Sequence, residues 1–236
     1  MIKKGIILSG GMGTRMSPLT KAVNKQLLPI YDKPLIFYPL SILMLAKIKD
    51  ILIIVNKGQL NQYRKIIPNG KNLGINIAYK EQAYPRGLPD AFVLGEKFIG
   101  KENVALILGD NFFYGQNLTK QLLNSVKLKK GAKIILHKVS KPELYGVANI
   151  NNKNKITALK EKPKNSKSNL AITGIYFFDN KVTEHSKSLK PSKRNELEIV
   201  DLLNKYNKKM LIKHTILSRG FIWFDAGTPS SLIKAS

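Results

Sequence analysis

The chain has 236 residues, of which 43% are hydrophobic and 23% charged, and it contains no cysteine. This composition is ordinary for a globular protein, and the lack of cysteine excludes a disulfide framework and a thiol nucleophile. The apolar runs are shorter than the roughly 18–20 residues of a membrane helix. The first residues also lack the long apolar region and cleavage site of a signal peptide. We therefore expect a cytoplasmic protein with no membrane partner.

The formal net charge is +25. A charge of this size is typical of nucleic-acid-binding proteins. However, only five of the 40 basic residues are arginine, and the lysines are scattered without a stripe of interleaved aromatic residues. Arginine is the residue preferred for base readout and for paired phosphate contacts. We interpret the lysines as a solvated surface, and we predict no nucleic-acid partner.

A glycine-rich run follows the first expected strand. Residues 5–8 are apolar, and they lead into Gly10, Gly11, Gly13 and Arg15. Such a turn can direct backbone N–H groups at phosphate oxygens, to which an arginine adds positive charge. The spacing matches neither a Walker A loop nor a dinucleotide fingerprint. The run predicts a triphosphate cradle, and the alternative is an ordinary strand-to-helix turn.

Strands and helices alternate through the first half of the chain. Their apolar patterns predict strands at residues 5–8, 51–55, 75–79, 104–108 and 132–138, and helices at residues 35–46, 60–67, 88–99 and 119–127. This order predicts an α/β fold with a doubly wound, mostly parallel sheet. Ligands bind such sheets at the carboxyl ends of the strands. Arg15 and Asp110 both follow strands, so we expect them to face one crevice.

The second half is richer in strands. The patterns predict a hairpin of residues 145–150 and 156–159, strands at 171–178, 211–217 and 221–225, a helix at 196–206 and a last helix capped by Ser230. Neither a linker nor a repeat interrupts the sequence. We therefore expect residues 1–236 to form a single domain.

The chain has only fifteen carboxylates, and two of them end expected strands. Asp110 follows residues 104–108, and Asp225 ends an aromatic strand. Carboxylates at strand ends can share Mg²⁺ with phosphate oxygens. Either residue could instead be a turn or cap aspartate, because spacing alone cannot show that they meet. Glu161, Lys162 and Arg194 could likewise bind a sugar phosphate or stand as solvated loop charges.

Eight motifs, taken in order, resemble the sugar-phosphate nucleotidylyltransferases, and among them the glucose-1-phosphate thymidylyltransferases. They occupy residues 10–20, 25–34, 106–115, 142–147, 161–163, 173–176, 196–201 and 223–228. The resemblance implies a Rossmann-like nucleotidyltransferase fold with a sugar-binding, β-rich second half. It implies that dTTP and α-D-glucose 1-phosphate give dTDP-glucose and pyrophosphate with Mg²⁺, early in dTDP-rhamnose-type biosynthesis. A homo-oligomer is also expected.

The resemblance further implies residue roles. Arg15, Lys25, Asp110 and Asp225 carry the chemistry, and the two aspartates hold Mg²⁺. The nucleotide is bound by Leu8, Gly10, Gly11, Gly13, Thr14, Arg15, Lys25, Gln26, Gln82, Gly87 and Asp110. The glucose and its phosphate are bound by Asn111, Tyr145, Gly146, Glu161, Lys162, Ile172, Tyr176 and Arg194.

The sequence departs from the family pattern at a few places. Ser9 stands where the family usually has alanine, Asn24 where it usually has serine, and Pro89 lies at an expected helix start. We also expect the regulatory helical tail of longer relatives to be missing. The alternatives are the same chemistry with UTP or another hexose phosphate, and a non-catalytic nucleotide-sugar-binding protein. A metal-dependent glycosyltransferase fits less well, because residues 109–111 lack its usual Asp-x-Asp.

Overall fold

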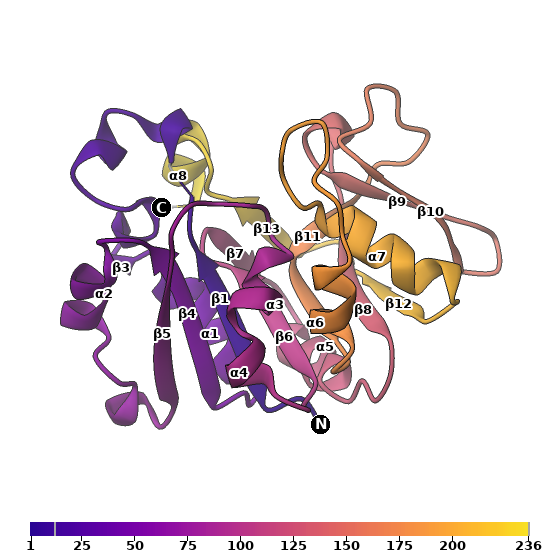
Figure 1. Ribbon diagram of the computed structural model, residues 1–236. Helices are drawn as coiled ribbons and strands as arrows, with labels where there is room; N and C mark the ends of the chain where they lie inside the picture. The colour runs from indigo at the N-terminus through magenta and orange to yellow at the C-terminus, as the bar shows by residue number, and fades with distance from the viewer. Residues whose placement is uncertain (12, 236) are drawn as a thin grey trace.

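The computed structural model describes residues 1–11 and 13–235. Met12 of the expected cradle and Ser236 of the expected domain lie outside the described residues. The chain folds into one large sheet with helices on both faces, and the N-terminus lies at the edge opposite the glycine-rich run (Figure 1).

Nine strands of the described part of the chain form the large sheet, in the order β10-β9-β11-β6-β1-β4-β5, with β8 paired to β11 and β12. Their bounds are β1 (Lys4–Ser9), β4 (Asp50–Asn56), β5 (Asn76–Gln82), β6 (Val104–Leu108), β8 (Ala132–Lys138), β9 (Gly146–Ile150), β10 (Ile156–Glu161), β11 (Leu170–Phe178) and β12 (Ile212–Ile216). Strands β6, β1, β4 and β5 are mutually parallel. Strand β11 then runs antiparallel to β6, β8 and β9.

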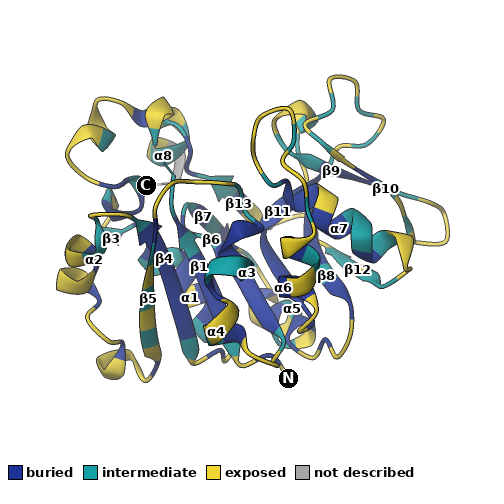
Figure 2. Ribbon diagram, viewed as in Figure 1, coloured by how far each residue is buried: buried dark blue, intermediate teal, exposed yellow. Residues whose placement is uncertain are grey.

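The helices cover the two faces of this sheet. Their bounds are α1 (Phe37–Leu45), α2 (Leu60–Ile66), α3 (Asp90–Leu94), α4 (Glu96–Ile99), α5 (Leu118–Ser125), α6 (Val182–Lys187), α7 (Ile199–Lys208) and α8 (Pro229–Ala235). Residues of α1, α2 and α5 belong to one apolar core, and residues of α3, α4, α6 and α7 belong to the other. The central strands β1, β4, β6, β8 and β11 are largely buried between these cores, whereas β5 at the edge alternates exposed and partly buried residues (Figure 2). The predicted doubly wound fold is confirmed.

Three predicted helix boundaries are wrong. The helix expected at residues 88–99 is two short helices that meet at Gly95, where a Cβ would lie 3.0 Å from the Ile6 side chain on the sheet. The helix expected from residue 196 begins at Ile199. The last helix begins at Pro229, and its cap is Thr228 rather than Ser230, because the Thr228 hydroxyl accepts the Ser231 N–H at 3.2 Å.

A short ribbon that the sequence did not reveal crosses the carboxyl end of the sheet. Strands β7 (Asn111–Tyr114) and β13 (Ile222–Asp225) pair antiparallel, with Asn111 opposite Asp225. A second small ribbon, β2 (Pro29–Ile30) with β3 (Lys33–Pro34), lies against α8, where Ile30 shares an apolar cluster with Ala226. Short 3-10 turns complete this region and the loops: η1 (Thr14–Met16), η2 (Leu19–Lys21), η3 (Lys25–Leu27), η4 (Lys71–Leu73) and η5 (Pro142–Leu144).

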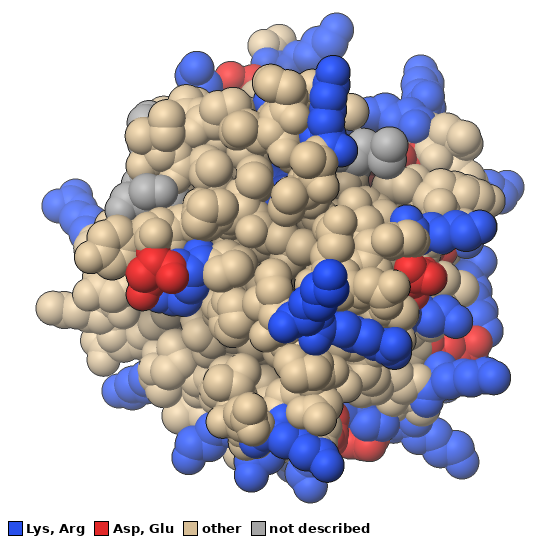
Figure 3. Space-filling view, turned by 90° about the vertical axis from the view of Figure 1, so that its left-hand side faces the viewer, with Lys and Arg blue, Asp and Glu red and all other residues tan. Residues whose placement is uncertain are grey.

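The surface agrees with the scattered lysines of the sequence. On the face shown in Figure 3, Lys and Arg side chains stand singly or in small groups among uncharged residues. Within residues 1–11 and 13–235, none of the helices combines the length and apolar character needed to cross a bilayer.

Asp179 joins β11, β8 and α7 in the interior of the protein. The side chain is buried, and its carboxylate accepts the Gly131 N–H at 2.6 Å, the Lys181 N–H at 3.1 Å and the Tyr206 hydroxyl at 2.9 Å. The residue therefore ties the end of β11 to the start of β8 and to α7.

We expect Asp179→Ala to lower the free energy of unfolding by about 2–4 kcal/mol, because it leaves a buried N–H and a buried hydroxyl without acceptors. Urea denaturation measures this change. Asp201→Ala, on the exposed side of α7, is the matched control and should change it by less than about 0.5 kcal/mol. Equal losses in the two variants would contradict the anchoring role of Asp179.

Candidate active site

Two residues outside the glycine-rich run hold it in place: Asn56 at the end of β4 and Thr20 in η2. The Gly11 N–H donates to Asn56 Oδ1 at 3.2 Å, and Asn56 Nδ2 donates to the Gly11 carbonyl at 3.0 Å. The Thr20 hydroxyl donates to the Gly13 carbonyl at 2.8 Å. Gly11 and Gly13 have φ values of 137° and 60°, which favour glycine. The loop is therefore shaped by its neighbours, and Asn56 is a positioning residue that the sequence did not identify.

Two glutamines line the side of the loop that is expected to bind the base. A Cβ on Gly10 would lie 1.5 Å from Gln82 Nε2, so only glycine leaves room for this amide. Gln82 Nε2 donates to Asn56 Oδ1 at 3.0 Å. Gln26 is buried, and its Oε1 has no hydrogen-bond partner among the described residues. A buried acceptor without a partner suits a ligand N–H.

Gly87 connects the base side to the second half of the chain. Its φ is 102°, and a Cβ there would lie 2.1 Å from the Leu197 carbonyl oxygen. The Leu197 N–H donates to the Arg86 carbonyl at 2.7 Å, and Gly87 and Leu197 form an isolated β-bridge. This bridge joins the loop before α3 to the segment before α7.

The β7–β13 ribbon brings Asp110 and Asp225 together, although 115 positions separate them in the sequence. Asp110 directly precedes β7, Asp225 ends β13, and the Ala226 N–H donates to the Asp110 carbonyl at 2.9 Å. Burial, together with the nearby Asp110 charge, raises the pKa of Asp225 to about 6, although Lys25 and Arg15 act in the opposite direction. The two carboxylates therefore form a pair of partly buried like charges.

Two cations lie beside this pair. The Lys25 ammonium forms an ion pair and hydrogen bond with Asp110. Burial favours the neutral form of Asp110, but Lys25 and the Asn111 amide outweigh burial and hold the pKa of Asp110 below its usual range. A Cβ on Gly227 would lie 2.8 Å from Arg15 Nη2 and 2.9 Å from Asp225 Oδ1, so the guanidinium and the carboxylate flank this glycine. The four residues predicted to carry the chemistry are thus neighbours.

The carboxylate pair fits a divalent cation. Mg²⁺ prefers oxygen ligands and commonly binds one or two carboxylates together with substrate phosphates. The pKa of Asp225 is raised first by burial and then by repulsion from Asp110, and such a cation would offset both. Among the described residues, no group of three or more His, Cys, Asp and Glu side chains could hold a metal. A metal at Asp110 and Asp225 would therefore complete its ligands with phosphate oxygens and water.

A second set of predicted residues meets where β9, β10 and β11 pack together. A Cβ on Gly146 would lie 3.3 Å from Ile172 Cδ1 and 3.4 Å from Glu161 Oε2. Burial raises the pKa of Glu161, with a further contribution from Glu198. Tyr176 is buried, and burial followed by the Glu161 charge raises the pKa of its hydroxyl. These residues form a partly buried cluster with one carboxylate.

Arg194 lies beside this cluster and is held there by Glu198, a residue that the sequence did not single out. Its guanidinium donates to Glu198 at 2.7 and 3.2 Å and to Glu161 Oε1 at 3.3 Å. Glu198 is itself buried and accepts the Ser192 hydroxyl at 2.6 Å. Glu198 therefore fixes Arg194 beside Glu161. Lys162, which follows Glu161, has a φ of 41°, an uncommon conformation for a residue with a side chain.

Asn111 links the two parts of the site. Its Nδ2 donates to Asp110 Oδ1 at 2.9 Å, and its Oδ1 accepts the Trp223 indole N–H at 2.6 Å and the Gly174 N–H at 3.1 Å. The two donors fix the amide so that its NH₂ group faces Asp110. Tyr145 packs on Trp223 with ring centroids 5.1 Å apart. The remaining predicted residues are Leu8 and Thr14. Leu8 lies near the end of β1, where its carbonyl accepts the Gly109 N–H, and Thr14 begins η1 after the glycine-rich run.

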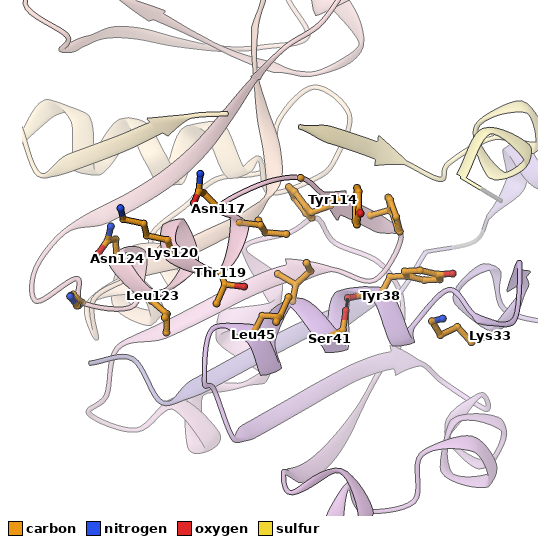
Figure 4. Close-up of a pocket in the computed structure, with 16 residues that line it drawn as sticks. Lys33, Tyr38, Ser41, Leu45, Tyr114, Asn117, Thr119, Lys120, Leu123 and Asn124 are labelled. Carbon is orange, nitrogen blue, oxygen red and sulfur yellow. Dashed lines mark hydrogen bonds between the residues drawn. The ribbon is translucent and has the colours of Figure 1, made fainter. Parts of the chain in front are cut away.

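A separate cavity of about 880 Å³ lies between α1, β7 and α5. Figure 4 shows Leu45, Ser41 and Tyr38 from α1 facing Tyr114 and the α5 side chains Thr119 and Lys120. The residues that line this cavity, in the part of the chain that the structure describes, include none of the predicted site residues.

Comparison with known proteins agrees with the architecture. The family model of nucleotidyl transferases matches residues 4–236. The chain is 48% identical, over 99% of its length and 81% of the relative, to a glucose-1-phosphate thymidylyltransferase of Neisseria meningitidis. It is 44% identical, over 99% of its length and 81% of the relative, to that of Mycolicibacterium smegmatis.

Solved structures give the same result. A Bacillus anthracis structure, assigned as a glucose-1-phosphate thymidylyltransferase and holding sucrose, superposes with a TM-score of 0.91 at 41% identity over 98% of this chain and 93% of that one. A UDP-glucose pyrophosphorylase with bound UDP-glucose superposes with a TM-score of 0.85 at 28% identity, over 100% of this chain and 97% of that one. The chain belongs to the nucleotidyl transferase family, and within it to the glucose-1-phosphate thymidylyltransferases.

We expect Asp225→Asn to stabilise the metal-free protein at pH 7.5 by about 3 kcal/mol, since each pKa unit corresponds to about 1.4 kcal/mol and folding raises the pKa of Asp225 to about 6. The pKa of Asp225 is raised on folding, so its ionisation destabilises the folded state as the pH rises from about 4 to 6, and the penalty persists above that range. Below pH 4 the two proteins should be equally stable. Urea denaturation in EDTA across this range measures the difference, and a pH-independent difference would contradict the assignment.

Proposed function

We propose that this chain transfers a thymidylyl group from dTTP to α-D-glucose 1-phosphate, giving dTDP-glucose and pyrophosphate, with Mg²⁺, at an early step of dTDP-rhamnose-type biosynthesis. The observation that carries the proposal is the convergence of Arg15, Lys25, Asp110 and Asp225 at one end of the sheet. The names of the relatives at 43–48% identity support the choice of substrates. We take residues 1–236 as one nucleotidylyltransferase domain that acts in the cytoplasm as a homo-oligomer.

The proposed reaction is a direct phosphoryl-group displacement. A phosphate oxygen of glucose 1-phosphate attacks the α-phosphorus of dTTP in line. A new P–O bond forms while the bond from the α-phosphorus to the bridging oxygen breaks, and pyrophosphate leaves with the electron pair. Because no covalent enzyme intermediate is needed, catalysis depends on positioning two anions and on neutralising their charge.

The nucleotide side would supply two of the four cations of the site, Arg15 and Lys25. Gly10, Gly11, Gly13 and Thr14 would hold the ribose and the triphosphate, and Arg15 would stabilise the leaving pyrophosphate. Lys25, which contacts Asp110, lies where it would neutralise the α-phosphate. Gln26, Gln82 and Gly87 would read the thymine edge, with Leu8 beneath, and the free Oε1 of Gln26 supports this role.

Asp110 and Asp225 would hold the metal. When bound, Mg²⁺ supplies Lewis-acid stabilisation of the triphosphate charge. The Asn111 amide keeps one Asp110 oxygen oriented, and Lys25 keeps Asp110 ionised, so the chain maintains a ready ligand before any cation arrives.

The sugar side would recognise glucose 1-phosphate. Glu161 would accept hydrogen bonds from sugar hydroxyls, and Lys162 and Arg194 would bind the phosphate. The pocket walls would be Asn111, Tyr145, Gly146, Ile172 and Tyr176. The fixed position of Arg194 between Glu161 and Glu198 supports this assignment, because a guanidinium held by two carboxylates is already oriented when the phosphate binds.

A second candidate is the same chemistry with UTP or another hexose 1-phosphate, or retention of nucleotide-sugar binding without turnover. The close superposition with UDP-glucose pyrophosphorylase favours UTP as the main competitor, because a similar backbone surrounds a uracil nucleotide there.

Pyrophosphate release distinguishes these functions. With Mg²⁺ and glucose 1-phosphate, we expect dTTP to give release at least about tenfold faster than UTP, ATP, CTP or GTP. Omitting glucose 1-phosphate is the control and should abolish release. Faster release with UTP would move the function to the uridylyl analogue, and no release with any triphosphate would leave only a binding function.

We expect Asp110→Asn to lower kcat by at least about a hundredfold, on the scale of removing one charge-stabilising group from an active site. Steady-state pyrophosphate release measures the loss. Asp201→Asn, which is exposed on α7, is the control and should keep normal turnover. Turnover of Asp110→Asn within threefold of the unmodified protein would refute the role of Asp110.

A further inference from the structure

Asn24 lies buried beside the candidate site, and its amide uses every hydrogen-bonding position. Its Oδ1 accepts the Gln26 N–H at 3.0 Å and the Tyr63 hydroxyl at 3.0 Å. Its Nδ2 donates to Gln59 Oε1 and, at 3.5 Å, to the Ser9 carbonyl. An amide has two acceptor and two donor positions, so Asn24 is saturated by these four contacts.

The four contacts join separate elements. Ser9 ends β1 at the start of the glycine-rich run, Gln59 precedes α2, and Tyr63 within α2 is fully buried. Asn24 itself caps η3, whose first residues are Lys25 and Gln26. The turn that carries these two side chains is therefore bound through one amide to the strand and helix that flank the glycine loop.

The position of this turn decides where two site residues point. Lys25 reaches Asp110, and its side chain is largely buried, so it has little freedom to follow a displaced backbone. Gln26 is buried as well, with its Oε1 available to a ligand. A rotation of η3 would move the ammonium and the amide together, away from the α-phosphate and the base.

A serine cannot make the same contacts. Its single hydroxyl has one donor, so it can cap the Gln26 N–H but cannot bind both Gln59 and the Ser9 carbonyl. Its shorter side chain also leaves the Tyr63 hydroxyl without the Asn24 acceptor in an environment that already raises the pKa of this tyrosine through burial. The asparagine of this chain is thus part of a larger network than a serine could support.

We propose that Asn24 is a positioning residue that sets the Lys25–Gln26 turn against the end of β1 and so aligns both side chains with the nucleotide. The proposal rests on the proposed function. It predicts a defect in turnover and in nucleotide recognition beyond the loss of stability that removal of a buried amide causes, with little effect on sugar binding.

The first test compares Asn24→Ala with Val126→Ala, a core change at the opposite end of the sheet. We expect Asn24→Ala to lower kcat with dTTP by about 10- to 100-fold, the cost of a misplacement near 1 Å. The KM for glucose 1-phosphate should change less than about threefold. Val126→Ala should lose stability with kcat unchanged. Turnover of Asn24→Ala within about twofold of Val126→Ala would overturn the proposal.

The second test does not use activity. In a double-mutant cycle followed by urea denaturation, Tyr63→Phe should lower the midpoint in the unmodified protein and leave it unchanged, or raise it, in the Asn24→Ala protein. Equal shifts in both backgrounds would show that the two side chains are not coupled and would overturn the network.

A third measurement separates this proposal from the proposed function. The unmodified protein is assayed beside every variant, and dTTP binding is measured by calorimetry. Synthesis of dTDP-glucose by the unmodified protein, with dTTP bound about tenfold more weakly by Asn24→Ala than by Val126→Ala, supports both. Normal synthesis with equal dTTP affinities overturns the role of Asn24 alone. Absence of synthesis in the unmodified protein overturns the proposed function and this role with it.

Discussion

The site depends on the pairing of β7 with β13. This ribbon places Asp225 opposite Asn111 and so next to Asp110, and Lys25 and Arg15 offset part of the repulsion between the two partly buried carboxylates. The charges alone would be unfavourable in a buried setting. They are maintained because each cation comes from a loop that is fixed elsewhere: Arg15 follows the glycine run and Lys25 begins a capped turn.

The parallel and antiparallel halves of the sheet contribute different kinds of groups to the candidate site. The parallel strands β1, β4 and β6 end in loops that present backbone N–H groups, amides and carboxylates, as parallel sheets commonly do at their carboxyl ends. The antiparallel strands β9, β10 and β11 present side chains from a pleated surface, which suits a sugar with hydroxyls on several sides. The reacting groups would meet where the two kinds of sheet join, between β6 and β11.

Local sequence was sufficient for the parallel half. The β-branched and apolar runs predicted β4 and β6, and the residues after strand ends pointed to Arg15 and Asp110. Tertiary contacts could not be predicted from local sequence patterns. Strand β7 is too short to give such a pattern. Asp225, Glu198 and Asn24 acquire their roles from side-chain and strand contacts that form only in the folded chain. The predicted helix is divided at Gly95, which lies close to Ile6 of the sheet, and helical periodicity reports neither the break nor this contact.

The bridge between Gly87 and Leu197 has a thermodynamic consequence. It makes one backbone segment common to the base side and to the chain that leads from Arg194 into α7. Under the proposed function, a shift of residues 85–87 on nucleotide binding would pass through this bridge to Leu197 and the segment that follows Arg194. Linkage is reciprocal, so sugar phosphate must alter the affinity for nucleotide by the same factor as nucleotide alters that for sugar phosphate. This single hydrogen-bonded crossing is thus the route by which the proposed nucleotide and sugar sides would sense each other.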